Sequence, residues 1–195
     1  DGYAGDGRAF RYRTAYLAPR DFQKVLGGRA LPFVKGGISD DPRLRASVRA
    51  LLDDYADAMS PLAWEDALFD LVTALEDLCG GSRELGRINR EAAETARDVL
   101  EARLERDVTL GDLERVTGRD RWQLSRDFRV LFGTSPHRYL VLRRLDRARG
   151  LMVNGTSASE AAYACGFADQ SHFGRHFKRA FGLSPHVWLR TARSF

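Results

Sequence analysis

Two stretches of the sequence, residues 120–132 and 169–181, carry side chains whose types and spacing suit contacts with nucleic acid. In the first stretch, the face opposite Leu124 and Phe128 presents Arg121, Trp122, Ser125, Arg126 and Arg129. In the second, the face opposite Phe173 and Phe177 presents Gln170, Ser171, Gly174, Arg175 and Lys178. Arginine can donate two hydrogen bonds to guanine and glutamine can pair with adenine, whereas the other polar side chains can reach phosphates.

These residue types separate into two predicted roles. The predicted contacts with base edges are Trp122, Ser125, Arg126, Gln170, Ser171 and Arg175. The predicted contacts with phosphates are Arg121, Arg129, His172 and Lys178. Two alternatives stay open: Arg126 and Arg175 could be structural ion-pair residues, because they occupy the same position in both stretches, and Trp122 could be a hydrophobic staple.

Other chemistry finds little support in the sequence. His172 and His176 have the four-residue spacing of a metal pair, but no glutamate lies between them and no third ligand is near, so we expect no metal and no cofactor. No Ser/His/Asp or Cys/His arrangement and no phosphate-binding glycine loop is present, so we predict no catalytic residue and no enzyme. We expect Cys79 and Cys165 to be reduced and intracellular.

The charge of the 195-residue chain is unevenly placed. Residues 1–81 carry 10 Lys and Arg against 13 Asp and Glu, whereas residues 82–195 carry 21 against 14. A basic C-terminal half favours an anionic partner, most commonly nucleic acid. The longest apolar run is far short of the roughly 18 residues that a membrane span needs, and no leader peptide is visible at the start, so we expect no membrane association.

An internal repeat organises the basic half. Residues 120–140 align with residues 169–189 at an offset of 49, and nine of the 21 positions are identical. In each copy a capped short helix, opened by Thr109 or by Ser157, precedes a glycine turn and a second helix that Asp120 or Asp169 caps. Two short helices joined by a glycine-containing turn form the helix-turn-helix pattern.

Helices and a strand are predicted around these two units. A long helix over 136–153 links the copies, and another covers about 89–104 before the first. Further upstream, apolar stripes predict helices over about 41–59 and 61–78. The alternation of Phe10, Tyr12, Thr14 and Tyr16 with polar or small residues predicts a strand that ends near Leu17.

The C-terminal half resembles the DNA-binding domain of AraC/XylS-type bacterial transcription regulators over about residues 87–193. The most specific part of the resemblance is Ala162-x-x-Cys165-Gly166-Phe167-x-Asp169-x-Ser171-x-Phe173-x-Arg175-x-Phe177-Lys178-x-x-Phe181-Gly182-x-Ser184-Pro185. The first copy matches at Leu124-Ser125-Arg126-x-Phe128 and at Gly133-x-Ser135-Pro136-x-x-Tyr139-Leu140. The departures are mild: Glu114 stands where the family usually has alanine, and Ala158 where it has a larger aliphatic residue.

The resemblance implies a mainly α fold in which a long helix joins two helix-turn-helix units. A helical pair and a remnant strand of a cupin-like β domain would precede these units. The implied domains are a remnant of an effector-binding and dimerisation domain (1–80), a linker (81–88) and the tandem DNA-binding domain (89–195). Most of the barrel is expected to lie upstream of Asp1.

The implied function is that of a cytoplasmic bacterial regulator that inserts its two recognition helices into successive major grooves of double-stranded DNA. The partners implied are a second copy of the chain, RNA polymerase and a small-molecule effector that the sequence does not identify; activation and repression both stay open. Two alternatives remain: an enzyme fused to such a DNA-binding unit, and a helical module whose basic face binds an acidic protein.

Overall fold

The computed structural model describes residues 12–55, 59–80 and 86–192, and every regular element within these ranges is a helix. The helices are α1 (Pro19–Leu26), α2 (Pro42–Tyr55), α3 (Pro61–Leu78), α4 (Arg90–Ala102), α5 (Leu110–Thr117), α6 (Arg121–Phe132), α7 (Pro136–Val153), α8 (Ala158–Ala164), α9 (Gln170–Phe181) and α10 (Pro185–Ala192). The predicted long helix over 136–153 and the predicted helix over 61–78 agree with α7 and α3.

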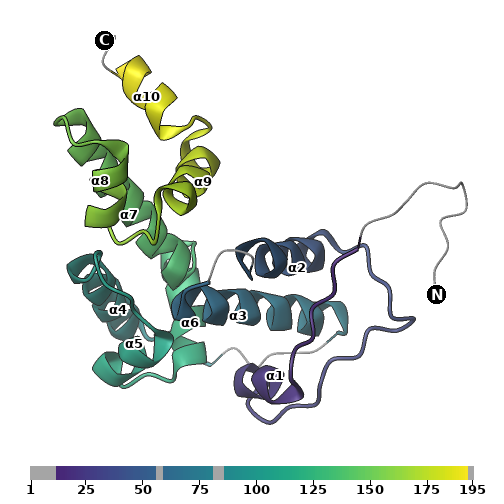
Figure 1. Ribbon diagram of the computed structural model, residues 1–195. Helices are drawn as coiled ribbons and strands as arrows, with labels where there is room; N and C mark the ends of the chain where they lie inside the picture. Colours follow the sequence, from purple (N-terminus) through teal and green to yellow (C-terminus); the bar gives the residue numbers. More distant parts are fainter. Residues whose placement is uncertain (1–11, 56–58, 81–85, 193–195) are drawn as a thin grey trace, which may run out of the picture.

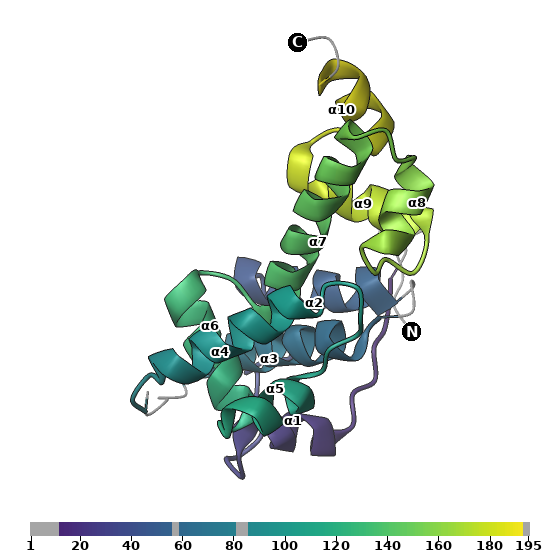
Figure 2. The ribbon, with the colours of Figure 1, turned by 90° about the vertical axis from the view of Figure 1, so that its left-hand side faces the viewer.

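The helices form two arms that meet at a corner (Figure 1). The upright arm consists of α7 with α8, α9 and α10 around its upper part, and the block of α4, α5 and α6 lies at its base. The second arm contains α1, α2 and α3, and α3 runs from the corner beneath α2. The view turned by 90° places α3 behind α4 and α6 (Figure 2).

Each helix-turn-helix unit has its own apolar core. The core of the first unit is built mainly from α4, α5 and α6, with Leu100, Leu113, Leu124 and Phe128 fully buried. The core of the second unit is built from α7, α8 and α9, with Leu145, Met152, Phe173 and Phe177 fully buried. Helical spacing of these residues creates the buried face of each helix, which leaves the opposite face for other contacts.

The apolar stripes of α2 and α3 pack against each other. Leu51 of α2 and Leu71 of α3 are buried in one cluster, and Leu17 and Phe22 pack against it from the segment before and within α1. α1 itself packs on α3 through Val25 and Leu26. The second arm is therefore a small helical layer with its own core.

The predicted strand near the N-terminus is wrong for the part of it that the structure describes. Phe10 lies outside the described residues, whereas Tyr12 to Leu17 are in an irregular segment. Tyr12 and Tyr16 are 77% and 94% exposed. A strand needs a neighbouring strand for its backbone hydrogen bonds, and the described part of the chain contains none, so a cupin-like remnant is not seen there.

The predicted domain boundary cuts across packed contacts between α3 and the first helix-turn-helix unit. Leu62 of α3 belongs to the core of the first helix-turn-helix unit, although it lies in the predicted 1–80 domain. Of the predicted linker, residues 81–85 fall outside the described ranges. None of the helices in the described ranges has the length and apolar character that crossing a membrane requires.

Candidate nucleic-acid interface

Caps and a tight turn position the second unit. The Ser157 side chain accepts a hydrogen bond from the Glu160 amide, and the Glu160 carboxylate accepts one from the Ser157 amide, so α8 begins with a complete capping box. Gly166 then turns the chain with φ of +79°, and a Cβ atom there would lie 2.8 Å from the carbonyl oxygen of Leu104. Only glycine fits this turn, which sets the angle between α8 and α9.

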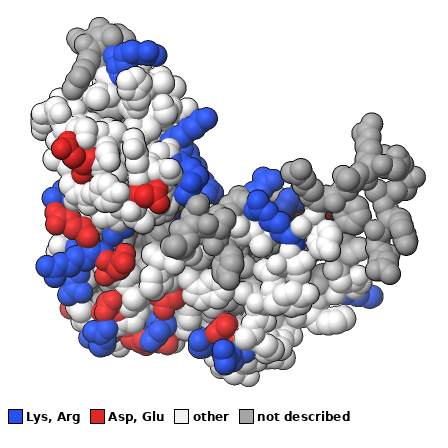
Figure 3. Space-filling model, viewed as in Figure 1, with Lys and Arg blue, Asp and Glu red and all other residues white. Residues whose placement is uncertain are grey.

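The outer face of α9 presents four of the predicted contact residues to solvent. Asp169 caps the helix by accepting from the His172 amide at 2.7 Å, while Phe173 and Phe177 hold the inner face in the core. Gln170, Ser171, Arg175 and Lys178 are all exposed. Basic side chains gather on this flank of the upright arm, facing the corner between the arms (Figure 3).

The two histidines of α9 form a compact pair at the lower end of this face. Their Nε2 atoms lie 2.8 Å apart, and both rings pack against Phe167. Burial, followed by the charge of His172, lowers the pKa of His176 to about 3, so His176 is neutral near pH 7. His172, a predicted phosphate contact, is half-buried. No group of three metal-ligating side chains occurs in the described ranges.

The first unit repeats the arrangement of caps. Thr109 and Asp112 form a capping box at the start of α5, and the Asp120 side chain accepts from the amides of Trp122 and Gln123 at the start of α6. The predicted contact residues of this unit therefore lie on a helix that an aspartate caps, as in α9. Their surroundings nevertheless differ from those on α9.

Helix α3 covers the face of α6 that carries three predicted contacts. Ser125 is fully buried, and Trp122 stacks on Phe69 of α3 with ring centroids 6.5 Å apart. The Arg129 guanidinium bonds the Ser125 hydroxyl and pairs with Asp70 of α3 at 2.8 Å. Its central carbon also lies 4.5 Å from the centre of the Phe69 ring.

The other two predicted contacts on α6 are ion-paired. Arg121 bonds Glu114 at 2.8 Å and reaches Glu65 of α3 at 3.5 Å. Arg126 pairs with its neighbour Asp127 at 2.6 Å, and that fully buried carboxylate also binds Arg119. Arg126 thus makes an ion pair of the kind that its structural alternative expects.

Three acidic residues of α3 were missed by the sequence analysis, namely Glu65, Asp66 and Asp70. Glu65 Oε2 accepts from the Leu110 amide at 2.8 Å, and Asp66 Oδ2 accepts from the His137 amide at 2.7 Å. The feature of the sequence that could have revealed them is the placement of acidic residues within an otherwise apolar helix. Such acids predict that the helix face carrying them contacts a polar partner. The partner itself lies 45 to 71 residues away.

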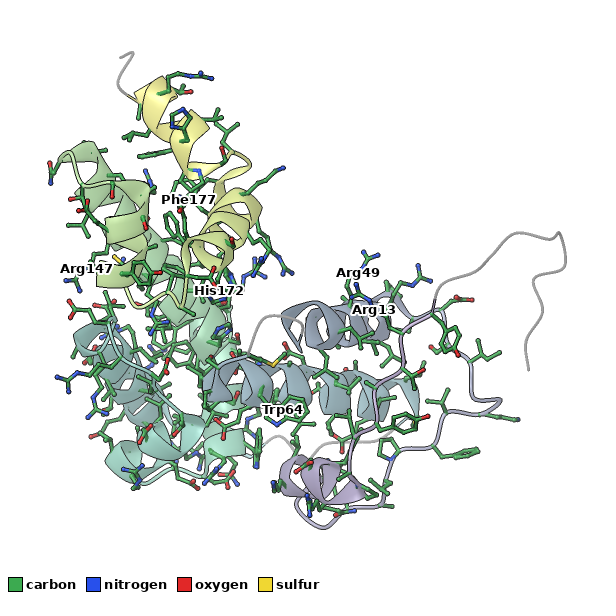
Figure 4. The ribbon with its side chains drawn as sticks, viewed as in Figure 1. Arg13, Arg49, Trp64, Arg147, His172 and Phe177 are labelled. Atoms are coloured by element: carbon green, nitrogen blue, oxygen red, sulfur yellow. The ribbon has the colours of Figure 1, made fainter. Side chains whose placement is uncertain are left out.

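A cleft of about 190 Å³ occupies the corner between the two arms. Its apolar walls come from α2, α3 and α7, including Ala50, Ala67 and Val141, and its polar lining includes Asp66, His137 and Arg179. The side chain of His172, at the lower end of α9, lies beside this corner, whereas Arg147 lies on the opposite side of the upright arm (Figure 4). The cleft separates α9 from the α2–α3 layer.

Comparisons with known proteins converge on one kind of domain. A family model described as a helix-turn-helix domain matches residues 113–191. The HTH-type transcriptional regulator YbfI of Bacillus subtilis is 28% identical over 173 residues, which cover 86% of this chain and 63% of YbfI.

Two solved structures are similar to the C-terminal half. An AraC-type regulator from Chromobacterium violaceum is 30% identical, with 53% of this chain and 93% of that chain covered and a TM-score of 0.49. The C-terminal domain of AraT, a response regulator from Geobacillus stearothermophilus, is 26% identical, covers 54% and 88%, and has a TM-score of 0.50. The chain spans less than two thirds of the length of the curated relatives it matches, 63% and 35% for the first two.

Proposed function

The chain belongs to the AraC/XylS family of helix-turn-helix regulators, and on that premise we propose that it regulates transcription by binding double-stranded DNA sequence-specifically. The observation that carries the proposal is the outer face of α9. Four side chains of the types that contact bases and phosphates stand exposed there on a helix whose other face is locked in a core. The matched relatives are named as regulators, and none of those reported above is named as an enzyme.

On this proposal α6 and α9 enter successive major grooves. In α9, Gln170, Ser171 and Arg175 read base edges, and Lys178 and His172 bind phosphates. In α6, base contacts fall to Trp122, Ser125 and Arg126, and phosphate contacts to Arg121 and Arg129. Arg126 differs from the other proposed base contacts, because its ion pair with Asp127 holds its guanidinium within the first unit.

A buried arginine supports a fixed spacing between the two recognition helices. Arg144 of α7 donates from Nε to the Leu104 carbonyl at 2.6 Å and from Nη2 to the Arg106 carbonyl at 2.9 Å. These bonds tie the long helix to the loop between α4 and α5. Major grooves on one face of DNA recur about every 34 Å, so a rigid link favours one register of the two helices.

The N-terminal part is proposed to serve assembly and control. We assign residues 1–80 to a remnant of an effector-binding and dimerisation domain, 81–88 to a linker and 89–195 to DNA binding. A homodimer would raise affinity by bringing two basic domains to one operator. RNA polymerase and a small-molecule effector are the further proposed partners.

Selection of bound duplexes from a random pool tests the proposed function. The chain should enrich an asymmetric sequence spanning two helical turns, because the predicted contact residues of α6 differ from those of α9. Binding that shows no sequence preference at any salt concentration would instead indicate a basic module for acidic proteins, the remaining alternative.

A further inference from the structure

We propose that α3 is a built-in competitor of DNA, whose acidic face occupies the DNA-facing side of α6 and must leave before α6 can enter a groove. The inference rests on the proposed function and concerns the regulation of the same site. It assigns to Glu65, Asp66 and Asp70 the positions that DNA phosphates would take.

Two helix N-termini of the DNA-binding domain lie against α3. Unpaired amides at a helix start are favourable sites for phosphates, because the N–H groups and the helix dipole both attract negative charge. In this structure, carboxylates of α3 fill two such sites of the DNA-binding domain. Glu65 accepts from the Leu110 amide of α5, and Asp66 accepts from the His137 amide of α7.

Two basic side chains of α6 also lie against α3. Arg121 and Arg129, the two predicted phosphate contacts of α6, both point at α3 carboxylates. Arg121 reaches Glu65 at 3.5 Å, and Arg129 pairs with Asp70 at 2.8 Å and with Asp66 at 3.5 Å. Two arginines and two helix N-termini from three helices thus converge on acids of one helix, as they would on one DNA backbone.

The covered face of α6 is closed to a duplex. Ser125 is fully buried, and Trp122 lies against the Phe69 ring with an interplanar angle of 14°. Since α2 lies along α3 on the far side (Figure 1), a duplex approaching α6 from this direction meets two helices. Base contact by Trp122 or Ser125 therefore requires α3 to move.

The contact is also one that DNA can displace. Burial is the largest influence on all three carboxylates, and it raises the pKa of Glu65, Asp66 and Asp70. The cost of desolvating these acids opposes their ion pairs. The polar contacts between α3 and the DNA-binding domain consequently stabilise the packing of α3 on α6 less than their number suggests.

The competing explanation is that α3 is simply a structural part of the first unit, since Leu62 contributes to that core. Two isosteric substitutions on α3 separate the two explanations. Asp70→Asn removes the charge that faces Arg129, whereas Asp77→Asn removes a charge two turns further along, where Asp77 pairs with Arg43 of α2. Both variants change the net charge equally.

The affinity of the full chain for its selected duplex is the first readout. We expect D70N to lower the apparent Kd about tenfold and E65Q/D70N to lower it further, because the binding-competent fraction rises. D77N should stay within about twofold of the wild type. Equal affinities for D70N and D77N would overturn the proposal.

Hydrogen exchange provides the second readout, independent of the variants. On addition of the selected duplex, amides of α3 should exchange faster while those of α9 become protected. Protection of α3 that stays unchanged or increases in the complex overturns the competitor role. If neither the wild type nor D70N selects any duplex, the proposed function itself fails, which is a separate outcome.

Discussion

At the scale of single residues, α9 offers the sharpest contrast between reading bases and binding backbone. Arg175→Ala should cost about 1–3 kcal/mol on the selected duplex and relax its base preference, because a bidentate base contact is lost. Lys178→Ala should weaken all duplexes alike and reduce the salt slope by about one. Binding isotherms on matched and mutated duplexes at several salt concentrations measure both effects.

The control for these two variants is Arg147→Ala. Arg147 pairs with Glu105 on the side of the arm away from α9, and its loss changes the net charge by the same amount. It should leave both affinity and base preference nearly unchanged. A loss of binding in R147A as large as that in R175A would contradict the assignment of the interface to α9.

A second prediction at this scale concerns pH. The pKa of His176 is about 3 in the fold against 6.5 in the unfolded chain, so the unfolded state binds more protons below pH 6.5. The resulting stability is present above pH 6.5 and is lost as the pH falls towards 3. Between pH 7 and pH 5 we expect the free energy of unfolding of the wild type to fall by about 2 kcal/mol more than that of H176Q.

The comparison with H176Q is needed because other groups titrate in the opposite direction. The pKa values of Asp66 and Asp70 are raised in the fold, which favours the folded state as the pH falls towards them. His137, with a pKa of about 4, shares the behaviour of His176. Urea unfolding at both pH values supplies the numbers, and identical pH dependence of the two proteins would count against the burial of His176.

At the scale of elements, local signals in the sequence predicted most helices. They did not predict correctly where the structure of a segment depends on contacts with a distant segment. The helices predicted over 136–153 and 61–78 are present as α7 and α3, and Ser135-Pro136 and Ser60-Pro61 start them, because a serine cap and a proline act within one turn. Helix α1 was missed, although Pro19 and Gly27 bracket it in the pattern typical of a helix. The strand failed because alternation alone provides no neighbouring strand.

The turn of the second unit yields a prediction at the element scale. Gly166→Ala should destabilise the chain by about 1–3 kcal/mol, since alanine disfavours a φ of +79° and its Cβ would press on the Leu104 carbonyl. Gly150→Ala is the matched control, because Gly150 is helical and has open space around its Cα. That variant should be neutral or more stable by up to about 1 kcal/mol.

Thermal unfolding of both glycine variants checks this contrast. The expected result is a lower Tm for G166A and an equal or higher Tm for G150A. If G166A unfolds at the wild-type temperature, the close approach of α7, α8 and the Leu104 loop is not as the structure has it.

At the scale of the whole molecule, the sequence predicted the two repeated units but not that α3 covers one face of the first unit. The outer face of α9 is local to one helix, so its residues follow from helical spacing. The cover on α6 depends on contacts between residues 56 to 59 positions apart, such as Arg121 with Glu65 and Arg129 with Asp70. No periodicity within either helix encodes that approach.

Assembly of two chains is the remaining prediction at this scale. We expect the chain to sediment as a dimer at tens of micromolar through its N-terminal part. Leu51 and Leu71 are buried within one chain, so changing them would unfold the arm, whereas Val48 of α2 is 37% exposed. V48D should therefore shift the protein towards monomer without changing its helix content, and a monomeric wild type would leave the dimer unsupported.

The central claim is that α6 and α9 read successive major grooves, and a hydroxyl-radical footprint on the selected duplex tests it most directly. The account predicts two protected patches on one face of the DNA, centred about one helical turn apart. The patch assigned to α6 should become stronger in D70N, which weakens the hold of α3. A footprint confined to a single turn in both proteins, or a symmetric footprint from one monomer, would contradict it.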